Sequence, residues 1–181
     1  MVVCIADFER LNKLLEIIID EREIIQMSEF ELGWRWAKTH SPDISKLEIE
    51  QILPVSDIES RRLNKVIQYF ENDSNLRGKY TESDWMRASS ESDEKIEKFR
   101  KNLDAILEKW EEGVIITWNR HITLKTSKEI FLKYWTDFLY PSSDDVTIIS
   151  EKTNWVMFYH HIEVANIWTR ISENREQLLT I

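Results

Sequence analysis

The stretch F-L-K-Y-W-T-D-F-L-Y-P-S-S-D-D-V-T-I-I, residues 131–149, is followed at residues 154–164 by N-W-V-M-F-Y-H-H-I-E-V. Aromatic side chains lie on both sides of a short acidic turn that begins at Pro141 and ends with Asp144 and Asp145. Large rings are costly to leave in water, so they are expected inside the molecule. This part of the chain is therefore predicted to form the structural heart of the fold.

Working outward from this stretch, a period of two dominates the chain after Gly113. Val114, Ile116 and Trp118 alternate with their neighbours, and a turn at residues 119–120 predicts a β-hairpin that returns through residues 122–124. A capping box of Thr126 with Glu129 predicts an inserted helix over residues 126–139, which Pro141 ends. Three further strands are expected at residues 146–149, 155–160 and 164–168.

Before Gly113, apolar residues recur at spacings of three and four, which is typical of amphipathic helices. Such stripes lie at residues 8–18, 32–37, 63–70 and 96–110, and capping residues are available at Asp7, Ser28 and Ser56. Gly113 is the expected C-terminal cap of the last of these helices. Residues 73–91 are loop-like, with Trp85 and Met86 expected to fold back as an anchor.

These patterns together predict an α+β protein, in which N-terminal amphipathic helices precede an antiparallel β-sheet and the inserted helix packs on one face. We expect one domain over residues 1–181, with a mainly helical part at 1–112 and a sheet part at 113–170. A chain of 181 residues with 42% hydrophobic residues is long and apolar enough to bury a full core.

Composition also limits the function. The chain carries 31% charged residues, no long apolar run and no secretory leader pattern, so a soluble cytoplasmic protein without a membrane role is expected. Its single cysteine, Cys4, excludes an internal disulfide. The formal net charge of -9 repels polyanions, and we therefore expect no nucleic-acid partner.

Acidic residues near two tryptophans suggest where a basic partner could bind. Carboxylates combined with aromatic anchors are typical of such interfaces, although a solvated helix with both tryptophans packed inside would give the same pattern. The acidic turn before residue 146 also combines carboxylates with nearby aromatic residues. The candidate partner-binding residues are Asp20, Glu21, Glu23, Glu29, Glu31, Trp34, Trp36, Asp144 and Asp145.

Histidines close to the acidic turn raise the question of catalysis. His161, Glu163 and Asp144 have the donor types of a metal site, and Ser142 or Ser143 beside an acid could suggest a small hydrolase. The serines lack the strand-to-helix elbow of such enzymes, and adjacent carboxylates point to opposite faces of a strand. We therefore expect no metal, no cofactor and no enzyme activity, with a hydrolase or metal-dependent enzyme as the alternative.

Residues 118–168 carry a resemblance. The order of strand, turn, aromatic helix, P-S-S-D-D-V-T-I-I and aromatic strand resembles small uncharacterised bacterial cytosolic proteins, in the style of immunity proteins of polymorphic toxin systems. The resemblance implies an α+β protein without enzyme activity that protects its cell by binding a cognate toxin, often a basic nuclease. A self-associating regulatory protein is a further alternative, and the sequence does not indicate an oligomeric state.

Overall fold

The computed structural model describes residues 17–171, so the helix expected from Asp7 onward lies almost wholly outside the described residues. Within this range the chain forms a mixed α+β structure, which confirms the predicted class. No helix in the described range has the length and apolar character needed to cross a membrane.

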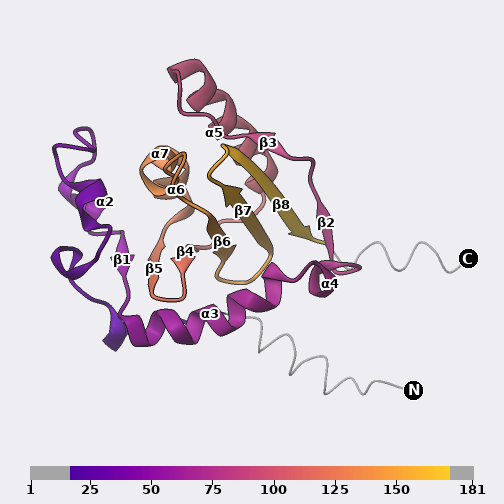
Figure 1. Cartoon of the computed structure of the whole chain (residues 1–181), viewed down its shortest axis with the longest axis horizontal. Coiled ribbons are helices and arrows are strands. Elements are labelled where there is room, and N and C mark those ends of the chain that lie inside the picture. Colours follow the sequence, from indigo (N-terminus) through magenta and orange to yellow (C-terminus); the bar gives the residue numbers. More distant parts are fainter. Residues whose placement is uncertain (1–16, 172–181) are drawn as a thin grey trace, which may run out of the picture.

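An antiparallel sheet of eight strands forms the centre of the molecule (Figure 1). The strand order is β1-β5-β4-β6-β7-β8-β2, and β3 pairs with the other end of β8. The strands predicted after Gly113 are confirmed, whereas β1, β2 and β3 come from the part that was expected to be mainly helical. The strands are β1 (Leu53–Pro54), β2 (Tyr80–Glu82), β3 (Met86–Arg87), β4 (Val114–Asn119), β5 (Ile122–Thr126), β6 (Val146–Ser150), β7 (Trp155–His160) and β8 (Val164–Arg170).

Two long helices agree with the sequence patterns, and both begin at a serine cap. Ser56 accepts a hydrogen bond from the backbone N–H of Glu59 at the start of α3 (Asp57–Glu71), and Ser92 caps α5 (Asp93–Leu107) in the same way. The remaining helices are short: η1 (Glu21–Glu23), η2 (Met27–Glu29), η3 (Gly33–Trp36), α2 (Lys46–Ile49), α4 (Asp73–Leu76), α6 (Lys128–Lys133) and α7 (Trp135–Phe138).

Three local expectations were wrong. The helix expected around Trp34 is a series of 3₁₀ turns, and a Cβ atom on Gly33 would lie only 2.2 Å from the carbonyl oxygen of Met27. Gly113 does not cap α5, which ends at Leu107. The inserted helix starts after Ser127, whose side chain caps it, and it is interrupted at Tyr134.

Helices cover both faces of the sheet, and the inserted helix packs on one of them, as expected. On the first face, α5, α6 and α7 pack over β-strand residues such as Ile116, Ile148 and Met157. On the second face, the apolar stripe of α3 packs against Ile115 and Ile149. Consecutive residues of β4 and β6 are buried, because both faces of these strands are covered.

The register of the strands arranges the second face in rows. One row, Ile115, Ile149, Val156 and Trp168, is apolar and belongs to the cluster under α3. The next row, Thr117, Thr147, Phe158 and Asn166, is largely polar. Since α3 ends at Glu71, its cover stops near this second row. The uncovered part of the face is where the candidate site lies.

A candidate binding site on the open face of the sheet

A hollow of about 550 Å³ lies on the uncovered part of the second face. Its size is within the range of pockets that hold small ligands or side chains of a partner. The residues lining it come from the end of α3, from the β2 edge of the sheet with the segment that follows it, and from β4, β6, β7 and β8. They are Glu71, Glu82, Trp85, Trp118, Asp145, Val146, Thr147, Phe158, Tyr159, His160, Asn166 and Trp168.

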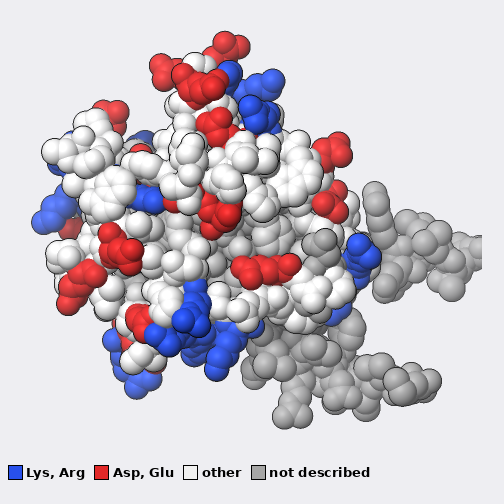
Figure 2. Space-filling view, in the orientation of Figure 1, with Lys and Arg blue, Asp and Glu red and all other residues white. Residues whose placement is uncertain are grey.

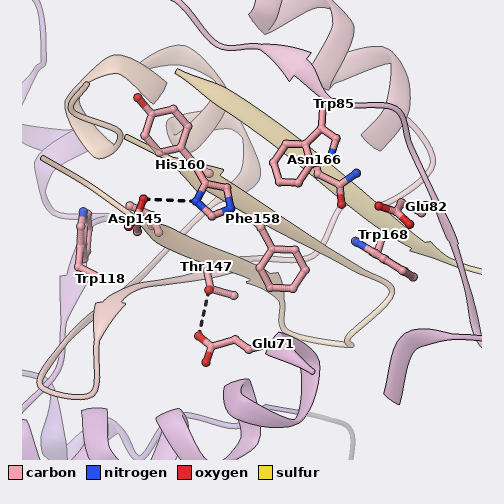
Figure 3. A pocket seen from close by; sticks show the side chains of 12 residues that line it. Glu71, Glu82, Trp85, Trp118, Asp145, Thr147, Phe158, His160, Asn166 and Trp168 are labelled. Carbon is pink, nitrogen blue, oxygen red and sulfur yellow. Dashed lines mark hydrogen bonds and ion pairs between the residues drawn. The ribbon is translucent and has the colours of Figure 1, made fainter. Parts of the chain in front are cut away.

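The floor of the hollow is the polar row of the sheet. Thr147 donates a hydrogen bond from its hydroxyl to a carboxylate oxygen of Glu71 at 3.2 Å. Asn166 donates from its side-chain amide to the carbonyl oxygen of Ser83 at 2.7 Å. Between them lies the half-buried ring of Phe158, which Figure 3 shows in the middle of the floor. The floor therefore has an apolar centre with polar groups on either side.

Three carboxylates line the hollow around the ring of Phe158, and all three side chains are exposed. They are Glu71 at the end of α3, Glu82 on β2 and Asp145 before β6. None of the described residues that line the hollow is Lys or Arg. On the face shown in Figure 2, acidic side chains lie near the middle, whereas Lys and Arg gather over α3. The hollow therefore favours a positively charged occupant.

One end of the hollow is formed by Trp85 and His160. Their ring centroids are 5.3 Å apart with the ring planes tilted by 43°, and 53% of Trp85 is exposed. Nδ1 of His160 lies 3.5 Å from Oδ1 of Asp145. The backbone N–H of His161 and its imidazole both bind Asp145, and these contacts hold the pKa of Asp145 below its ordinary value. The carboxylate thus remains ionised well into acid.

The opposite wall contains Trp118, and its position depends on a β-bulge. The register between β4 and β5 shifts between Thr117 and Asn119, so Trp118 lies at the irregularity. Its indole N–H donates to Oδ2 of Asp144 at 3.2 Å. The half-buried ring therefore lines the hollow while its polar edge is held from inside the protein.

Behind this wall lies a buried guanidinium, which we call the Arg35 cage, formed by Arg35, Asp144, Trp34, Trp118 and Tyr140. Arg35 and Asp144 are 4% and 6% exposed, and two nitrogens of the guanidinium bind the carboxylate at 2.6 and 3.1 Å. The guanidinium carbon lies 4.3 Å from the ring centroid of Tyr140 and 5.5 Å from that of Trp118.

The electrostatics of the cage balance two opposing effects on Asp144. Burial pushes the pKa of this carboxyl upward, but hydrogen bonds from Arg35 and from the backbone N–H of Tyr140 outweigh burial and lower it. The carboxyl of Asp144 is therefore ionised at neutral pH.

The structure brings only one of the predicted partner-binding residues, Asp145, into the hollow. Trp36 is 1% exposed between Phe30 and Phe138, and Asp144 lies in the Arg35 cage. The expectation that these two present a binding surface was wrong, because the core and the guanidinium occupy their side chains.

The other predicted residues lie around the N-terminal turns, away from the hollow. Asp20 pairs with Arg22, Glu23 accepts a hydrogen bond from Ser56, and Glu29 accepts one from the backbone of Gln26. Glu21 and Glu31 are exposed, and 45% of Trp34 is exposed with its edge against Tyr140.

The proposed metal ligands are separated by their own partners. Asp144 is bound by Arg35, whereas His161 binds Asp145 in the turn between β7 and β8. Glu163 lies in that same turn with a φ of 61°. Over residues 17–171, no three His, Cys, Asp or Glu side chains are grouped so that they could hold a metal ion.

Sequence analysis missed most of the hollow, including Glu71, Glu82, Phe158 and Asn166. One signal was available in the spacing of residues along the strands. Ile149, Val156 and Trp168 lie under α3, and the residues two positions away share their face of the sheet. These residues are Thr147, Phe158 and Asn166. A polar residue at such a position marks the place where helix cover ends.

Comparison with known proteins does not assign this chain to a group: no family model, curated protein or solved structure gives a significant match.

Proposed function

We propose that the protein is a non-catalytic binding protein of the cytoplasm that receives a basic surface of a protein partner. The partner is of the kind that an immunity protein neutralises, namely a basic toxin whose active surface would be covered in the complex. The observation that carries the proposal is the hollow, in which Glu71, Glu82 and Asp145 lie around aromatic side chains and no Lys or Arg from residues 17–171 lines the wall.

Physical chemistry supports a protein partner at this face. Opposite charges accelerate the encounter of two proteins, and a desolvated aromatic side chain supplies the short-range free energy. Trp85, which is 53% exposed beside the hollow, is suited to be that anchor. Ile162, 62% exposed in the turn after His160, extends the apolar part of the rim.

The test is co-expression with the product of each neighbouring gene, a basic one first, followed by size-exclusion chromatography of the mixture. We expect a stoichiometric complex whose dissociation constant rises with salt, because part of the attraction is between charges. We also expect co-expression to relieve the toxicity of that protein. A partner that neither co-elutes nor loses its toxicity would contradict the proposal.

Surface variants locate the interface in the same assay. Glu71→Gln with Glu82→Gln removes two charges at the hollow, and Asp104→Asn with Glu108→Gln removes two exposed charges from the α5 region on the other face. Both double variants change the net charge equally. We expect only the first to weaken the complex substantially, and equal weakening would indicate attraction by net charge without this site.

A further inference from the structure

We propose that the hollow is a socket for one arginine side chain of the partner, a step that rests on the proposed function and makes it specific. In this arrangement the guanidinium lies over the ring of Phe158. The carboxylates of Glu71 and Glu82 bind it, and Figure 3 shows Phe158 between these two residues. The indoles of Trp85 and Trp168 enclose its aliphatic stem.

The protein itself holds a guanidinium in this way a short distance inside the wall. In the Arg35 cage, a carboxylate binds two guanidinium nitrogens while the rings of Tyr140, Trp118 and Trp34 lie within 4.3 to 5.6 Å of the guanidinium carbon. The hollow presents the same two kinds of group, carboxylates and aromatic rings. Trp118 contributes to both, since it contacts Asp144 and lines the hollow.

Arginine is favoured over lysine for a physical reason. A guanidinium is planar, stacks on aromatic faces and binds carboxylates through several N–H groups in fixed directions. An ammonium is a compact and strongly hydrated charge that loses more hydration in a hollow of this kind. The aromatic floor and the separate carboxylates of Glu71 and Glu82 match the first geometry better than the second.

The volume of the hollow is suited to an arginine side chain that belongs to a larger partner protein. A hollow of about 550 Å³ exceeds what one side chain fills, so it also has room for the backbone that carries the arginine. The open position of Trp85 at the rim allows such a chain to approach from solvent.

The experiment uses three acetylated and amidated pentapeptides, Gly-Ala-X-Ala-Gly, in which X is arginine, lysine or citrulline. Each is titrated into the ¹⁵N-labelled full chain while the indole N–H signals are followed by NMR, with signals assigned through Trp85→Phe and Trp34→Phe variants. We expect the arginine peptide to shift the Trp85 signal saturably. The lysine peptide should need about a fivefold higher concentration for half saturation.

Citrulline tests the charge, because it has the shape of arginine without a cation. We expect no saturable shift of the Trp85 signal with this peptide at the concentration that saturates arginine binding. Equal binding of arginine and citrulline peptides, or of arginine and lysine peptides, would overturn the proposal.

The paired variants test the position. Glu71→Gln with Glu82→Gln should raise the half-saturating concentration of the arginine peptide about tenfold. Asp104→Asn with Glu108→Gln should change it less than twofold, since Asp104 lies on α5 and Glu108 directly follows this helix. If both double variants act equally, or if the Trp34 signal responds in place of Trp85, the socket is excluded.

Failure of the arginine socket can be distinguished from failure of the proposed binding function. A salt-sensitive complex with the basic partner that survives Glu71→Gln with Glu82→Gln unchanged would keep a binding protein but overturn the arginine socket. If this variant binds neither the arginine peptide nor the partner, both proposals are supported.

Discussion

The Arg35 cage and the hollow are neighbouring sites made from the same chemical groups, yet one is closed and the other open. In the cage, Asp144 and Arg35 are almost fully buried and bind one another, whereas Glu71 and Glu82 in the hollow are exposed. In the cage, a carboxylate and aromatic rings stabilise the fold because the cation that they bind, Arg35, belongs to the chain. The same groups form a candidate binding site in the hollow, where no Lys or Arg of the described residues is among the lining side chains.

The largest expected effect is the loss of the ion pair in the cage. Asp144→Ala leaves the guanidinium of Arg35 buried without its carboxylate, and we expect the free energy of unfolding to fall by about 3–5 kcal/mol. Urea denaturation followed by circular dichroism measures it. The matched control is Arg35→Met with Asp144→Leu, which removes both charges and should recover much of the loss; equal destabilisation by both variants would contradict this account.

Acid should affect the cage in a defined direction. The folded-state pKa of Asp144 lies below its ordinary value of 3.8, so its contribution to stability is fully present above that pH. The contribution is lost as the pH falls through the lowered folded-state pKa. We expect the stability difference between wild type and Asp144→Asn to be constant near neutral pH and to shrink below about pH 4. A difference that grows in acid would show the opposite shift.

Trp118 connects the two regions and should have an intermediate effect. Trp118→Phe keeps an aromatic ring at the wall but removes the indole N–H that binds Asp144. We expect a loss of about 1–2 kcal/mol in stability, as for a hydrogen bond to a charged group, together with weaker binding of the arginine peptide. If stability falls while peptide affinity is unchanged, the two regions are independent.

The smallest expected effect concerns Glu71 and has opposite signs for stability and binding. Its negative charge lies at the C-terminal end of α3, whose last turn contains no basic residue. A helix dipole disfavours an anion at this end, so Glu71→Gln should stabilise the protein by about 0.3–1 kcal/mol. The same variant should bind the arginine peptide more weakly. Thermal unfolding and the NMR titration measure the two changes, and Glu108→Gln, at the residue after the end of α5, serves as a comparison. A loss of stability in Glu71→Gln would show that its contact with Thr147 dominates.

Sequence reasoning predicted the elements whose signals are local. Helix α3 follows from the cap at Ser56 and the stripe that ends at Phe70, and the β4–β5 hairpin follows from alternation in β4. It failed where distant residues meet: Arg35 and Asp144 are 109 positions apart, and no periodicity connects them.

The hollow was beyond prediction for a related reason. Glu71 and Thr147 come together only because α3 crosses the second face and ends there, and neither the choice of face nor the register is encoded in a local pattern. The same dependence on register brings Phe158 beside Asn166.

The most direct test of the central claim is an intermolecular NOE experiment on the full chain with the arginine pentapeptide. The account predicts contacts between the arginine side-chain methylene protons and the ring protons of Phe158 and Trp85. Contacts confined to Trp34 and Tyr140, or to any surface outside the hollow, would contradict it.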